Sequence, residues 1–173
     1  MTTVFKGSSL PISGINSPKL RRAHDYWSER RAQRSMPSRL DIRPEELVSL
    51  LGNVMLVDVS YEPPDLRYRL FGSEIALSHG ADFTGKSVRD LDPPGFNELI
   101  WEQYMEVVTS GEPRVHRVIY ETPRRLASYE RLTLPLSADG QTVDMLFAIS
   151  EYERRFWQAV EEDLASGASG GSK

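Results

Sequence analysis

The fold is constrained most by strand-like runs that occur as neighbours along the chain. The five runs cover residues 53–60, 66–71, 114–121, 129–136 and 143–150. The first two are separated by a short segment containing Pro63-Pro64, and the last two by a turn containing Asp139-Gly140. An Asp-Gly pair between two apolar runs is a strong hairpin signal. Because hairpins join antiparallel strands, the sequence predicts a five-stranded antiparallel sheet.

Helical patterns surround and interrupt these runs. Phe96, Ile100, Tyr104 and Val107 recur at helical spacing, and Gly111 and Pro113 end the predicted helix over 96–110. Another helix is predicted to begin at Ser17-Pro18 and to stop before Pro37. Three more are predicted over residues 44–51, 73–78 and 151–164. Strand hairpins with helices inserted between them indicate an α+β fold, with one long helix and short helices on one face of the sheet.

The 173 residues suit one domain with extensions. Five regions are expected along the chain: a flexible tail over 1–16, flanking helices over 17–52, a core over 53–150, a C-terminal helix over 151–165 and a second flexible tail over 166–173. The tails are rich in Gly and Ser and lack apolar periodicity.

Cysteine is absent, which excludes disulfides, thiolate metal sites, iron–sulfur clusters and thiol nucleophiles. The three histidines are far apart in sequence, so we expect no metal site. The chain has no apolar run of membrane-spanning length and no leader pattern at its N-terminus. We therefore expect a cytoplasmic protein with no membrane contact. No Ser, His and acid set indicates a nucleophile, and we predict that the protein is not an enzyme.

Residues 80–87 (GADFTGKS) satisfy the phosphate-loop pattern G-x-x-x-x-G-K-[ST] letter by letter. A phosphate loop needs a buried strand before it and a sustained helix after it. Here a helical pattern precedes the motif and Pro93-Pro94 follows within a few residues. The context therefore argues against nucleotide hydrolysis.

Residues 19–43 carry eight basic residues against three acids, whereas the whole chain has a net charge of −4. A basic helix of this kind can follow nucleic-acid phosphates. The acidic balance of the rest of the chain favours a solvated face paired with acids elsewhere, so nucleic acid is not the expected partner. A nucleic-acid-binding regulator remains the alternative function, and a small enzyme on the same α+β fold is the third.

Four segments together resemble PAS domains, above all short bacterial PAS proteins once filed as a domain of unknown function. They are RYRLFGSEIALSHG (67–80), FTGKSVRDL (83–91), VTSGEP (108–113) and YERLTLPLSADGQTVDMLFAIS (129–150). The resemblance covers about residues 20–152 and explains the false phosphate loop as a structural turn. It implies a stand-alone sensory or protein-interaction module in bacterial signalling, in which the sheet and short helices enclose a pocket.

The resemblance names no single cofactor. Flavin adducts and thiol-linked chromophores of PAS domains need a cysteine, and residues 96–110 contain no histidine that could ligate haem. We expect a colourless protein that binds a small metabolite or has a filled core. Because no effector segment follows the PAS-like region, we expect the signal to leave through contact with an unidentified signalling protein.

The residues that this arrangement can bring between the long helix and the sheet are aromatic or polar. The predicted ligand-site residues are Tyr68, His79, Trp101, Tyr104, His116 and Glu130. Core packing or ion pairing is the alternative role for each of them; for Glu130 the expected partner is Arg117. The face of the strand on which His116 lies is left open.

Leu20, Ala23 and Trp27 form a narrow apolar stripe on the N-terminal helix. A stripe of this kind has to be covered. We expect a homodimer in which these residues dock on the outer face of the sheet. The acidic C-terminal segment would orient the basic helix, in the same chain or its partner.

Overall fold

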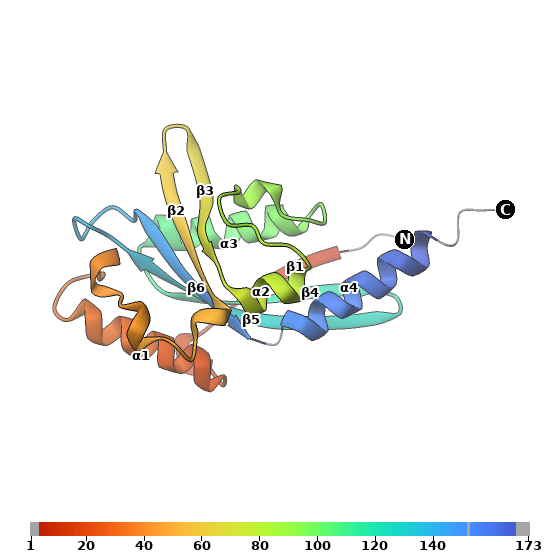
Figure 1. Cartoon of the computed structure of the whole chain (residues 1–173), viewed down its shortest axis with the longest axis horizontal. Coiled ribbons are helices and arrows are strands. Elements are labelled where there is room, and N and C mark those ends of the chain that lie inside the picture. Colours follow the sequence, from red (N-terminus) through yellow and green to blue (C-terminus); the bar gives the residue numbers. More distant parts are fainter. Residues whose placement is uncertain (1–3, 152, 169–173) are drawn as a thin grey trace.

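The computed structural model describes residues 4–151 and 153–168. It is an α+β fold built on one six-stranded sheet with the order β1-β4-β5-β6-β2-β3 (Figure 1). Every neighbouring pair is antiparallel. The strands are β1 (Val4–Leu10), β2 (Val54–Tyr61), β3 (Pro64–Phe71), β4 (Arg114–Thr122), β5 (Arg125–Leu136) and β6 (Met145–Glu151). The α+β class is confirmed, with one strand more than expected.

The four α-helices are α1 (Pro18–Arg31), α2 (Ser73–His79), α3 (Phe96–Ser110) and α4 (Glu153–Ala168). Helix α1 packs on β5 and β6, while α3 packs on β1 and β5 and α4 packs on β5 and α2. Register and burial place α1 against one face of the sheet, and α2, α3 and α4 against the other (Figure 1). We call these the outer and the inner face.

Alternation along β5 distributes its side chains between the two faces. Tyr129 and Arg131 point to the inner face, and Leu132 and Leu134 point to the outer face. All four are buried, because helices cover both sides of this central strand. The long helix α3 has the predicted bounds, and Gly111, in the left-handed conformation at φ 67°, ends it.

Residues 4–10 correct the expected flexible tail over 1–16. They form strand β1, which pairs with β4 from Val4↔Glu121 to Leu10↔Val115. The run VFKGSSL has little apolar content, and its order comes from hydrogen bonding to β4 and from Phe5 packing on Phe96 and Tyr120. Residues 1–3 lie outside the described part.

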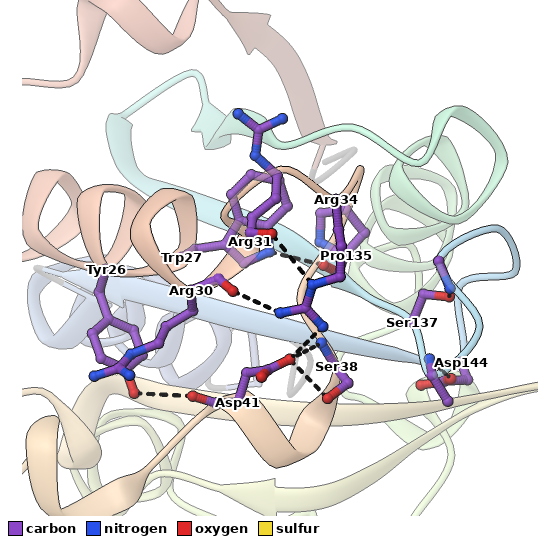
Figure 2. A network of polar contacts seen from close by, with 12 residues as sticks. Tyr26, Trp27, Arg30, Arg31, Arg34, Ser38, Asp41, Pro135, Ser137 and Asp144 are labelled. Carbon is purple, nitrogen blue, oxygen red and sulfur yellow. Dashed lines mark hydrogen bonds and ion pairs between the residues drawn. The ribbon is translucent and has the colours of Figure 1, made fainter.

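The outer face is covered by α1 of the same chain (Figure 2). Leu20, Ala23 and Trp27 are buried, and Trp27 Nε1 donates a hydrogen bond of 2.8 Å to the Pro135 carbonyl. The expected dimer stripe is therefore occupied within the chain, because the apolar sheet face and the stripe satisfy each other. A homodimer through these three residues is not available in this conformation; dimerisation by another surface stays a prediction.

Two other expectations change in detail. Residues 44–51 form no α-helix: the 3₁₀ turns η3 (Pro44–Glu46) and η4 (Leu51–Asn53) stand there instead. Leu47 and Leu50, which lie between the two turns, are nevertheless buried, so this apolar pattern reflects contact with the core and not a helical period. Helix α4 extends over residues 166–168 of the expected C-terminal tail, and residues 169–173 lie outside the described part. None of the described helices is both long enough and apolar enough to cross a membrane.

Candidate ligand site between the sheet and α3

The inner face of the sheet, α3 and the first turn of α4 enclose a group of buried polar side chains, which we call the cup. Arg131 and Tyr129 come from β5, Tyr68 from β3, and Tyr104 from α3; Glu153 opens α4. All five are at most 5 % exposed. A buried arginine and a buried carboxyl in an apolar core are unusual, because burial of charge costs free energy unless it is compensated.

The guanidinium of Arg131 is held by neutral groups. Its Nη2 donates to Oε1 of Gln103 on α3, and its carbon lies 4.7 Å from the centre of the Tyr104 ring. Arg131 Nε has no hydrogen-bond partner among the described residues. These contacts, together with the Tyr129 side chain, leave the Nε donor of the arginine unused.

Glu153 is the one carboxyl among the described residues that line the cup. It accepts a hydrogen bond from the Ser150 hydroxyl and interacts electrostatically with the Arg131 guanidinium. Burial raises the pKa of Glu153 to about 7, although the hydrogen bond from Ser150 and the charge of Arg131 act in the opposite direction. At neutral pH the cup therefore holds a carboxyl that is partly protonated.

Helix α4 closes the cup with aromatic side chains. Trp157 packs on His79 and Phe96, with ring centres 4.1 and 4.9 Å apart, and Phe156 packs on Tyr129 at 4.9 Å. Burial lowers the pKa of His79 to about 4, so this imidazole is neutral at physiological pH. The void that remains has a volume of about 10 Å³. That volume is at the lower limit for one water molecule.

Comparison with known proteins identifies the family to which this fold belongs. A sequence model of the PAS domain matches residues 15–150, which is most of the chain. The chain belongs to the PAS domain family. It is thus a PAS-type sensory or interaction module, a class whose members are typically not enzymes.

A solved structure described as "Structure of an RNA-binding Light-Oxygen-Voltage Receptor" is similar to this PAS domain at 14% identity and a TM-score of 0.44. The match covers 98% of this chain but only 44% of the receptor, so the chain spans less than half of that protein. A search of curated proteins found no match.

Three of the six predicted ligand-site residues come together in the cup of the PAS domain. Tyr68 and Tyr104 are fully buried beside Arg131, and burial raises the pKa of both phenols. His79 lines the same void from the end of α2.

Trp101, His116 and Glu130 lie elsewhere. Trp101 is one position along α3 from Ile100, which turns it away from the cup, and it stacks under the Arg89 guanidinium at 3.9 Å. His116 is buried on the inner face, but under the C-terminal half of α3, where its Nε2 lies 2.6 Å from Glu106. Glu130 faces outward and pairs with Arg117 at 2.8 Å, the ion pair expected for it.

The sequence reasoning missed Tyr129, Arg131, Gln103 and Glu153. In the run YERLTLPL, the alternation that sends Glu130 outward sends Tyr129 and Arg131 inward, so the signal was present in the strand pattern. Gln103 directly precedes Tyr104 on α3. Because α3 carries several other polar residues, nothing in the sequence indicated that this one is buried. Glu153 became part of the cup only because α4 folds back over the inner face.

The segment that imitates a phosphate loop forms a structural turn, as the resemblance implied. Gly80 ends α2, and Gly85 donates a backbone hydrogen bond of 2.7 Å to the Tyr68 carbonyl. The Ser87 hydroxyl donates to Asp65 at 2.6 Å. The segment therefore covers the outer edge of β3 instead of opening a phosphate-binding helix. No group of three or more metal-ligating side chains occurs in the part of the chain that the structure describes.

Proposed function

We propose that this PAS domain is a sensory module that receives a small molecule in the cup, between the sheet and α3. The main support is that several buried polar side chains meet in an otherwise apolar interior: Arg131, Glu153, Gln103 and the tyrosine hydroxyls. Few polar groups set in an apolar, aromatic wall are typical of small-molecule sites. Such a set has no evident structural necessity, since apolar residues of similar volume often stabilise a core as well or better.

Family membership supports the same proposal, because PAS domains resemble one another in enclosing a pocket between the inner face of the sheet and the helices. The output partner is an unidentified signalling protein. Helix α4 is the element best placed to report the state of the cup, because Glu153, Phe156 and Trp157 all contact it and the same helix reaches the β4–β5 hairpin through Asp163 and Arg125.

Two measurements test the proposal. Native mass spectrometry of freshly purified protein detects a retained small molecule. Backbone amide shift mapping with a library of small metabolites then locates any binder. We expect shift changes at residues of the inner face and α3. Shift changes confined to α1 and the outer face, or no binder in the whole library, would contradict the proposal.

The alternative of nucleic-acid binding has less support, because the basic residues near α1 are largely bonded within the chain. Arg30 pairs with Glu46 at 2.6 Å. Arg34 pairs with Asp41 at 2.9 Å (Figure 2). Arg22 donates to Ser49 at 3.0 Å. Retention on DNA or RNA that falls steeply with salt would favour the alternative.

A further inference from the structure

The unused donor capacity of Arg131 points to the chemical class of the ligand. The guanidinium donates to Gln103, lies over the Tyr104 ring and interacts with the Tyr129 side chain, but its Nε has no hydrogen-bond partner among the described residues. An arginine fork matches the two oxygens of a carboxylate and gains most from such a partner where water is excluded. A neutral ligand would leave the buried positive charge with only the partly protonated Glu153 as a counter-charge.

The carboxyl that the chain itself brings to the cup does not fill this role. Glu153 accepts a hydrogen bond from Ser150 and acts on Arg131 through its charge, but it leaves the Nε donor of Arg131 unpaired. The first turn of α4 therefore occupies the cup without satisfying the arginine. A ligand whose carboxylate reaches the fork would make the contact that Glu153 lacks.

The size of the void decides how a ligand can enter. About 10 Å³ is free, so any organic molecule has to replace part of the wall. The strands are held by continuous pairing, and α3 contacts both β1 and β5. Helix α4 packs on α2 and β5 but forms no strand pairing, and it contributes Glu153 to the lining of the void. Its first turns can therefore leave without breaking the sheet.

The wall that remains is aromatic. Tyr68, Phe71, Phe96 and Tyr104 line the cup, and the group that would leave with α4 includes the rings of Phe156 and Trp157. A ring or branched alkyl group can replace such rings at similar volume.

We propose that the cup takes a small aryl or alkyl monocarboxylate, which binds Arg131 through its carboxylate and displaces the first turns of α4 with Glu153. This inference rests on the proposed function and adds to it the ligand class and the moving element. Gln103 positions the guanidinium, and Glu153 occupies part of the cup that the ligand has to enter.

The test compares phenylacetate with phenylacetamide, which has the same ring but no charge, by isothermal titration calorimetry and by hydrogen exchange of the α4 amides. We expect phenylacetate to bind at least tenfold more tightly than phenylacetamide, because only the anion pairs with Arg131. We also expect bound phenylacetate to speed exchange of the amides between Phe156 and Val160.

Three variants separate the roles. Arg131→Met should abolish the preference for phenylacetate, whereas Arg117→Met, which removes an arginine from the outer face at the neighbouring strand, should leave it unchanged. Glu153→Gln should weaken phenylacetate binding at pH 8 by roughly tenfold, since a neutral side chain is more stable in the buried cup than the carboxylate that the ligand has to displace. If Arg131→Met does not fold, the Glu153→Gln result alone decides.

Each outcome has one meaning. Equal binding of both probes at the inner face would overturn the carboxylate assignment and leave the proposed function intact. Phenylacetate binding without faster exchange in α4 would overturn the displacement. Absence of phenylacetate binding to the wild type and to Glu153→Gln would overturn the inference, while binding of an unrelated library compound to the inner face would still support the proposed function.

Discussion

Trp27 on α1 and Pro135 on β5 are joined by a buried hydrogen bond of 2.8 Å between the indole Nε1 and the Pro135 carbonyl (Figure 2). The two residues are 108 positions apart, and this contact fixes the helix on the outer face of the sheet. Ser137, two residues further along, donates its backbone N–H to the Pro37 carbonyl at 2.9 Å. The N-terminal region is thus an integral part of the domain.

Replacing Trp27 by Phe should retain much of the packing but leave the buried Pro135 carbonyl without its donor. We expect the free energy of unfolding to fall by about 1–3 kcal/mol, measured by chemical denaturation. Trp101→Phe is the matched control, since Trp101 is only partly buried and no hydrogen bond of its indole is among those observed. Equal destabilisation by the two substitutions would contradict the role of the Trp27 bond.

Between pH 4 and pH 7 the pH dependence of stability should contain opposed contributions from Glu153 and His79, and the lowered pKa of His116, caused by burial, acts in the same direction as that of His79. The pKa of Glu153 is raised from 4.5 to about 7, so between these values the folded state holds the proton longer and stability falls as pH rises. The pKa of His79 is lowered from 6.5 to about 4, so the unfolded state binds the extra proton in this window and stability rises as pH rises. The charged or titratable groups acting on Glu153 include Arg131, Tyr104 and Tyr129, and Asp92 acts on His79.

Single variants should separate these contributions in denaturation series between pH 4 and pH 8. Glu153→Gln should leave the His79 effect, so stability should increase up to about pH 6.5. At pH 8 this variant should exceed the wild type by roughly 3 kcal/mol at most, the amount that the raised pKa represents. His79→Phe should show the reverse slope, with stability falling up to about pH 7. Parallel curves for wild type and both variants would refute these assignments.

Gly7 on β1 gives Gln103 room to reach Arg131. A Cβ at this position would lie 2.3 Å from Gln103 Nε2 and 2.8 Å from Leu99 Cδ1. Because Gln103 is buried and bonded to Arg131, Gly7→Ala should displace it and lower the free energy of unfolding by about 1–3 kcal/mol. The Arg131 Nε resonance should shift in NMR spectra. Gly14→Ala serves as the control, since the nearest atom to its Cβ would be 3.5 Å away. An unchanged Arg131 Nε resonance in Gly7→Ala would contradict the role of Gly7 in positioning Gln103 against Arg131.

Ala32 ends α1 in a conformation that favours glycine, with φ 52° and ψ −121°. Ala32→Gly should raise the free energy of unfolding by about 1 kcal/mol, because it removes this strain. Asp25→Gly, at an exposed position inside the same helix, should lower stability instead. Thermal unfolding of the pair gives the comparison, and a loss of stability in Ala32→Gly would show that the backbone is not strained there.

Dimerisation remains open to direct measurement. Light scattering at concentrations of tens of micromolar would detect a dimer of ordinary weak affinity. Since Leu20, Ala23 and Trp27 are buried within the chain, their replacement by Asp should unfold the domain rather than release a folded monomer. A folded monomeric Leu20→Asp variant of a dimeric wild type would restore the original stripe hypothesis.

Local sequence patterns predicted a large part of the fold. The helix over 96–110 was placed correctly because its apolar spacing, Gly111 and Pro113 all act within a few residues. The strands β2 to β6 were found for the same reason, since period-two alternation and turn residues are local signals. Tyr68, His79 and Tyr104 were placed in the cup because aromatic residues on these elements had to face either the core or the solvent.

The sequence by itself determined strands β2 to β6, the four α-helices and the α+β class. Only the tertiary structure decided that VFKGSSL becomes β1, because its order depends on the edge of β4 rather than on its own apolar content. It also decided that α1 covers its own sheet and that α4 carries Glu153 to Arg131's side of the core. Each of these outcomes depends on contacts between residues far apart in the chain, and their free energy exists only when both partners are already in place.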